Sequence, residues 1–117
     1  MSKSDRGAAA LRHMLNHAQE AVSFAQGRTR ADIQTDRLLN LALVRLLEII
    51  GEAAGRVPEE MRAQHPEIPW TQIVGLRNRL THGYDSVDLD ILWQIISRDL
   101  PPLIVSLETI IKKGEAD

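Results

Sequence analysis

The chain contains no cysteine at any of its 117 positions. This absence excludes disulfide scaffolds, thiolate zinc sites and thiol nucleophiles. No apolar run approaches the ~20 residues that a bilayer-spanning helix needs. Residues 1–7 lead into alanine-rich sequence of mixed polarity and not into the apolar core of a signal peptide. We therefore expect a cytoplasmic protein.

Aromatic side chains are also scarce, with only Phe24, Trp70, Tyr84 and Trp93 in the whole chain. The chain has fourteen basic and sixteen acidic residues, which gives a net charge of −2. A platform that stacks successive bases needs more aromatic side chains, and a general nucleic-acid coat needs a basic balance. The sequence therefore argues against OB-type and RRM-type recognition, and we expect any contact with RNA or DNA to come from a local basic patch.

The length and the composition fit one soluble globular domain. A chain of 117 residues has room for a single core, and its 44% hydrophobic and 26% charged content is average for such domains. We expect one domain over 1–117, with its core over about 5–112.

Helical spacing of apolar residues dominates the pattern. It predicts a first helix over 4–26, stopped by Gly27, and a strongly apolar central helix over 31–57, ended by Pro58. A short turn over 59–63 and a proline-rich connector over 65–70 follow. No strand alternation appears, and the predicted fold is an all-α up-and-down bundle of four or five helices.

Two more helices complete the bundle. One is expected over 70–82, capped at Gly83, and the last over 89–112, with Asp88 as its N-cap. The pair Pro101-Pro102 should kink or split that last helix, and the residues after it should fray.

His13, His17 and Glu20 share one face of the first helix at a spacing suited to metal ligation. No second pair of comparable quality completes a di-metal core, and histidines on an amphipathic helix are usually surface residues. We therefore expect neither a metal nor another cofactor.

A charged stripe on the central helix has two interpretations. Arg45, Glu48, Glu52 and Arg56 line it, with Arg45–Glu48 and Glu52–Arg56 as favourable pairs. The stripe is either a solvated face, or Glu52 orients an active-site arginine.

Small residues on the same helix, Gly51 and Gly55, permit close approach of another helix. That approach is either tight internal packing or a dimer seam.

The segment 75–84 is the most informative one. It carries arginines and His82 in a stretch, 68–84, without any acid. Arg77 can hold a phosphate bidentately, His82 titrates near neutrality, and Asn78 lies one helical turn before His82. On an ideal helix Arg77 and His82 stand about 140° apart, so they converge only at a distorted helix end or across a two-fold axis. The alternative is a helix end at which His82 interacts with the dipole.

The spacing Arg-x-x-x-x-His-x-Tyr over 77–84, late in a small helical bundle, resembles the HEPN superfamily. More specifically, it resembles HepT-type toxins of HepT/MntA (HEPN/MNT) toxin–antitoxin systems. The segment 47–54 resembles the central-helix signature of the family, and 66–70 resembles its connector. Leu92-Trp93 and Leu100-Pro101 follow at the family's spacing, so the resemblance covers about 5–112.

This resemblance implies a metal-independent endoribonuclease that acts as a homodimer, with RNA as its substrate. Arg77 would stabilise charge on the scissile phosphate, His82 would act as general base or acid, and Asn78 would position them. Tyr84 would be the residue that a partner nucleotidyltransferase antitoxin AMPylates. The alternative is a helical subunit that binds a nucleotidyltransferase or a nucleotide and cuts nothing.

Overall fold

The structure is a computed structural model that describes residues 2–81 and 86–116. Its helices are α1 (Lys3–Ala25), α2 (Arg30–Thr35), α3 (Arg37–Gly55), α4 (Glu59–Ala63), α5 (Trp70–Val74), α6 (Leu76–Leu80), α7 (Leu89–Gln94), the π-helical segment η1 (Ile95–Asp99) and α8 (Leu100–Ala116). The described residues form no strand; their one strand-like contact is an isolated bridge. The predicted all-α fold is therefore confirmed.

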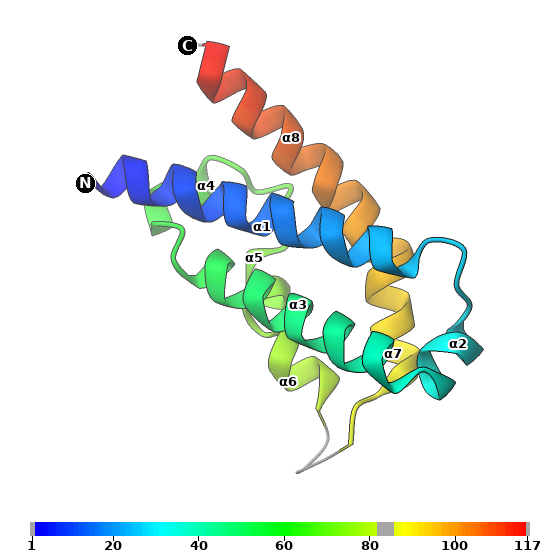
Figure 1. The fold of residues 1–117 in the computed structure, drawn as a ribbon. Helices are drawn as coiled ribbons and strands as arrows, with labels where there is room; N and C mark the ends of the chain where they lie inside the picture. Colours follow the sequence, from blue (N-terminus) through cyan, green and yellow to red (C-terminus); the bar gives the residue numbers. More distant parts are fainter. Residues whose placement is uncertain (1, 82–85, 117) are drawn as a thin grey trace.

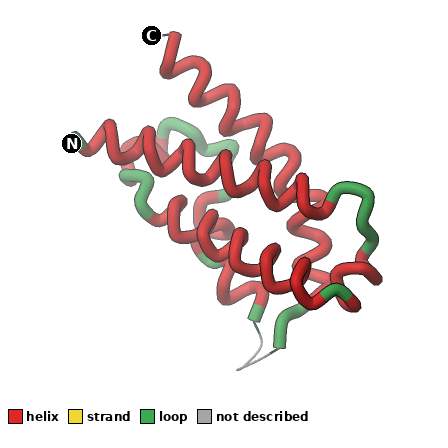
Figure 2. Tube along the Cα trace, viewed as in Figure 1, coloured by secondary structure: helices red, strands yellow, loops and turns green. Residues whose placement is uncertain are grey.

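The three long helices α1, α3 and α8 define the architecture (Figures 1 and 2). α1 runs the length of the molecule, α3 returns alongside it, and α8 leads back along α1. On its other side, α3 is covered by the short helices α5 and α6. The central position predicted for α3 is thus confirmed, and its side chains Leu43, Leu47 and Ile50 are fully buried.

The first boundaries follow local capping chemistry. Ser2 and Asp5 form a capping box at the start of α1, and Gly27, with φ +74°, provides the turn after it. The single helix expected over 31–57 is wrong, because the structure divides it at Asp36. The carboxylate of Asp36 accepts a hydrogen bond from the Leu39 amide, which begins α3 as a separate helix.

The end of the chain also departs from the expectation. An irregularity was predicted at Pro101-Pro102, and η1 directly precedes them, while the prolines themselves lie in the first turn of α8. Proline has no N–H to donate to a carbonyl one turn earlier, so a wider turn costs less here. The Leu100 amide donates to Ile95 five residues back. The expected fraying is wrong, because α8 continues to Ala116.

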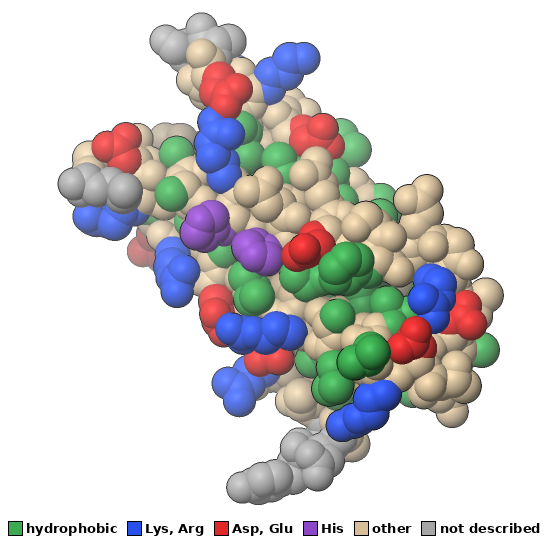
Figure 3. Space-filling model, in the orientation of Figure 1, with side chains coloured by type: hydrophobic (Ala, Val, Ile, Leu, Met, Phe, Trp, Pro, Cys, Tyr) green, Lys and Arg blue, Asp and Glu red, His purple; other side chains and the backbone are tan. Residues whose placement is uncertain are grey.

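Hydrophobic side chains gather on one face over the end of α1 and the start of α3 (Figure 3). Phe24, Leu38 and Leu41 are 45%, 81% and 49% exposed, and we call these three residues the apolar patch. Among the described residues, no helix is both long enough and apolar enough to cross a membrane.

Candidate active site

The arginines of the basic segment, Arg77 and Arg79, lie on α6, and α5 and α6 replace the single helix expected over 70–82. The two helices meet at Gly75, which ends one and begins the other. Glycine in a helix interior costs ~0.5–1 kcal/mol relative to alanine, so the break falls where helix is least favoured. Ile73, Leu76 and Leu80 are buried and anchor both helices to the core.

The contact between α5 and α3 is close because of Gly51. A Cβ on Gly51 would lie 2.9 Å from the carbonyl oxygen of Ile73. Gly51 is buried in the chain, so internal packing is the correct interpretation there and a dimer seam is not. Nothing lies within 4 Å of a Cβ built on Gly55, which is exposed.

Arg77 and Asn78 are both exposed on α6. Neither side chain forms an ion pair or a hydrogen bond with the part of the chain that the structure describes. Arg79 instead turns towards η1, where its guanidinium lies 3.8 Å from the carboxylate of Asp99. The two arginines therefore have different environments: Arg77 is available to a ligand, whereas Arg79 is held by an acid.

The helix that carries Arg77 ends earlier than expected. The Thr81 amide and hydroxyl both donate to the Arg77 carbonyl, at 3.2 and 3.0 Å, and the Thr81 backbone is extended. α6 ends at Leu80, so the single helix on which the 140° offset and the shared face of Asn78 and His82 were predicted does not reach His82. His82 lies outside the described residues, so the second chain at the site stays a prediction.

The described residues on the two sides of 82–85 contact each other. Thr81 and Val87 form an antiparallel bridge, and the Asp88 amide donates to the Leu80 carbonyl at 2.8 Å. The Asp88 carboxylate then accepts from the Ile91 amide, which confirms its predicted role as the N-cap of α7. The predicted residues His82, Gly83 and Tyr84 lie outside the described residues.

The candidate metal ligands on α1 are near one another but do not converge on a site. The rings of His13 and His17 are 6.2 Å apart, and the Nδ1 atom of His17 lies 2.7 Å from the His13 carbonyl oxygen. Across the described ranges, 2–81 and 86–116, no group of three His, Asp or Glu side chains is arranged to hold a metal.

The charged stripe of α3 pairs differently from the expectation. Arg45 bonds Glu52 at 3.4 Å, with side chains 60% and 53% exposed, and neither expected pair forms among the described residues. Glu52 is engaged by Arg45, and no contact joins it to Arg77 within the described segments. The solvated-face interpretation fits this arrangement.

Sequence reasoning missed Asp99 and its contact with Arg79. The two residues are twenty positions apart, and only the tertiary fold brings them within 3.8 Å. The proline pair pointed to an irregularity at this place but not to a π-helical turn, so the position of Asp99 had no local signal.

The description "Ribonuclease HepT-like" belongs to the family model that matches residues 14–110. The chain therefore belongs to the HepT-like ribonuclease family. The predicted family, HepT-like, and the predicted enzyme class, ribonuclease, are both confirmed.

Similar curated proteins come from bacteria and archaea. A "Putative RNase" of Caldanaerobacter subterraneus is 36% identical over 103 residues, which cover 88% of this chain and 92% of the relative. A "Probable ribonuclease HepT" of Thermococcus cleftensis is 35% identical, with 84% and 93% covered. A "Putative RNase" of Methanocaldococcus jannaschii is 34% identical, with 94% and 100% covered. No solved structure gives a significant match.

Proposed function

We propose that the protein is a metal-independent endoribonuclease toxin of a toxin–antitoxin system, silenced when a cognate nucleotidyltransferase AMPylates Tyr84. The supporting observation is Arg77, which is exposed on α6 without a protein partner among the described residues and stands five positions before His82 in the sequence. The neighbouring Arg79, by contrast, lies 3.8 Å from the carboxylate of Asp99. Membership of the HepT-like ribonuclease family supports a phosphate as the ligand of this cation.

The chemistry needs no cofactor. Arg77 binds the scissile phosphate through two N–H groups and stabilises the charge that develops on its oxygens. His82 takes the proton of the ribose 2′-hydroxyl, whose oxygen attacks phosphorus, or protonates the 5′-oxygen as the P–O5′ bond breaks. Asn78, adjacent to Arg77, positions these groups.

The assembly in this proposal is a cytoplasmic homodimer of a single HEPN-like domain. The apolar patch supports it, because a side chain as exposed as Leu38 gains most from a second surface that covers it. The last helix, α8, offers a second exposed apolar side chain, Val105, which is 64% exposed.

The test is cleavage of total RNA in the presence of EDTA by the wild type and by Arg77→Ala and His82→Ala. Both variants should lose activity by about 100-fold or more, the typical cost of losing a charge clamp or a positioned acid–base group. Arg56→Ala is the matched control, because Arg56 is exposed on the turn after α3 and should not matter. Activity that disappears in EDTA, or that survives in both variants, contradicts the mechanism. If the wild type cuts no RNA, the result supports the alternative, a helical subunit that binds a nucleotidyltransferase or a nucleotide without catalysis.

A further inference from the structure

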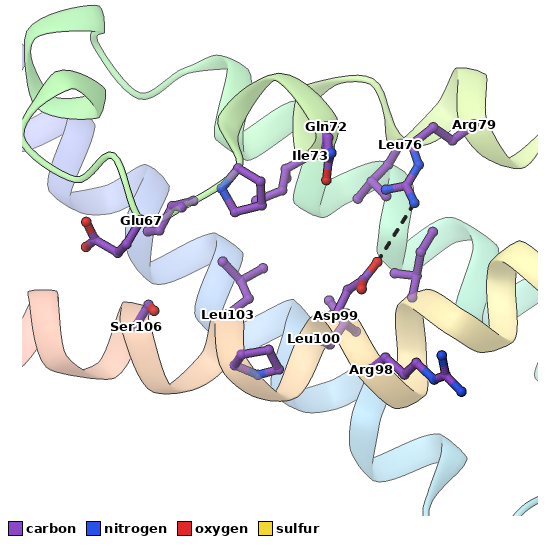
Figure 4. A pocket seen from close by; sticks show the side chains of 14 residues that line it. Glu67, Gln72, Ile73, Leu76, Arg79, Arg98, Asp99, Leu100, Leu103 and Ser106 are labelled. Atoms are coloured by element: carbon purple, nitrogen blue, oxygen red, sulfur yellow. Dashed lines mark ion pairs between the residues drawn. The ribbon is translucent and has the colours of Figure 1, made fainter.

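A cavity of about 230 Å³ lies between α5–α6 and the η1–α8 arm (Figure 4). Apolar side chains from both sides form most of its wall, among them Ile73 and Leu76 from α5–α6 and Leu103 from α8, and polar and charged side chains complete it. Gln72 points into it from α5 and offers both a donor and an acceptor. The volume is below the range for drug-sized ligands, roughly 300–1,000 Å³, and suits a single flat ring system.

The charges at the two ends of this cavity differ. At the α6 end, Arg79 is paired with Asp99, and Arg98 is exposed without an ion pair among the described residues. At the far end, Glu67 lies 3.7 Å from the ring of His65. One positive charge, that of Arg98, is therefore left over at the α6 end, where an anionic group would be favoured.

The π-helical segment η1 supplies two of the residues that line the α6 end of the cavity, Arg98 and Asp99. In Figure 4 the Asp99 carboxylate points towards Arg79, whereas the Arg98 side chain extends outwards from the cavity. Asp99 holds Arg79 in place and leaves Arg98 as the available donor. Short π-helical turns inside helices are frequent at functional sites.

We propose that this cavity binds one nucleobase of the RNA strand while Arg98 contacts a phosphate beside it. Apolar walls hold the faces of an unstacked base, the Gln72 amide meets its polar edge, and the free guanidinium binds the backbone. This inference rests on the proposed ribonuclease function and adds a binding subsite to it.

The subsite is within reach of the catalytic arginine. Arg77 and Arg79 are two residues apart on α6, so they point to nearly opposite sides of the helix. About one helix diameter, ~10–12 Å, then separates Arg77 from the cavity, and a strand that crosses the exposed end of α6 contacts both.

The experiment measures binding of a single-stranded, fully 2′-O-methylated RNA, which lacks the attacking hydroxyl and stays intact. Fluorescence anisotropy at several salt concentrations gives both the affinity and its salt dependence. Arg98→Ala should weaken binding about tenfold and lower the slope of log K against log salt by about 0.7, the value for one phosphate contact. Gln72→Trp, which fills the cavity, should weaken binding and leave the slope unchanged.

Arg56→Ala is again the control, and Arg98→Lys should retain the salt slope. The inference is overturned if both Arg98→Ala and Gln72→Trp bind like this control while the wild type cleaves ordinary RNA. If only Arg98→Ala weakens RNA binding, the cavity does not bind a base. If only Gln72→Trp weakens RNA binding, Arg98 does not contact a phosphate. A wild type that neither binds nor cleaves RNA removes the proposed function as well.

Discussion

Gly51 on α3 faces the carbonyl oxygen of Ile73 on α5, and a methyl group on Gly51 would lie 2.9 Å from that oxygen. The obstacle is backbone, which cannot rotate away as a side-chain terminus does. α5 and α6 must therefore shift before any larger residue is accommodated, and α6 carries Arg77.

The first prediction concerns this contact. Gly51→Ala should lower the free energy of unfolding by ~1–3 kcal/mol, the usual cost of overpacking, and should reduce ribonuclease activity through the shift of α6. Urea denaturation and the RNA cleavage assay measure the two effects.

Two glycines provide matched controls for that variant. Gly55→Ala meets open space and should be neutral or slightly stabilising. Gly7→Ala meets the end of the Met61 side chain, which can rotate away, and also the Pro58 ring at 3.0 Å, so it should cost more than Gly55→Ala. Equal stability of Gly51→Ala and Gly55→Ala would show that the α3–α5 contact is looser than described.

The second prediction concerns the junction of α2 and α3. The Arg28 guanidinium bonds Asp36 at 2.8 Å, and this bond, together with the Leu39 amide, holds the pKa of Asp36 below its ordinary value of 3.8. A carboxyl with a lowered pKa stabilises the fold above its unfolded-state pKa, and that stabilisation is lost as the pH falls through the folded-state pKa.

Arg28→Ala should therefore be less stable than the wild type at pH 7, and the difference should shrink below about pH 4 as Asp36 is protonated. Thermal unfolding over that pH range measures it. Arg37→Ala, which removes an exposed arginine at the start of α3, should show no such pH-dependent difference. A stability gap for Arg28→Ala that does not vary with pH would exclude Asp36 as its source.

The third prediction concerns the apolar patch. If it forms the homodimer interface, Leu38→Asp should shift the mass in light scattering from twice the chain mass of 13.1 kDa towards that single-chain mass. A charge in a covered apolar contact is costly, whereas the same charge on an exposed side chain costs little. Val105→Asp is the matched variant on α8 and should remain dimeric. The reverse result would place the interface on the last helix, and a monomeric wild type would remove the dimer from the proposal.

Local signals explain which parts of the fold were predictable. Asp88 was predicted as a cap because its side chain and the apolar run after it are adjacent in sequence, and the structure confirms it. The division at Asp36 had a similar signal, since Thr29 and Asp32 form a capping box around α2 and Asp36 caps the next helix. The break was not predicted because the strong apolar periodicity of 31–57 indicated one continuous helix.

The site was only partly predictable for a different reason. Arg77 and Asn78 stand out because they lie in a basic stretch without acids, but their geometry relative to the rest of the site depends on where α6 ends. That end depends on the bridge between Thr81 and Val87, a pairing across six positions that helix periodicity does not reveal. The contact between Arg79 and Asp99 likewise depends on how two distant segments pack.

The last prediction concerns Tyr84, whose role the family resemblance implies. AMPylation would attach a phosphodiester and an adenosine two residues beyond His82. The added group resembles the RNA linkage that we propose Arg77 binds. Its negative charge would oppose the arrival of substrate phosphates, so RNA binding should weaken. The modified protein should stay folded but inactive.

Incubation with ATP, magnesium and the cognate nucleotidyltransferase, followed by intact-mass measurement, should show one or more added AMP groups on the wild type and a loss of ribonuclease activity. Tyr84→Phe lacks only the acceptor hydroxyl, so it should gain no mass and remain active under the same treatment. A Tyr84→Phe protein that is modified and silenced like the wild type would place the modification on another residue.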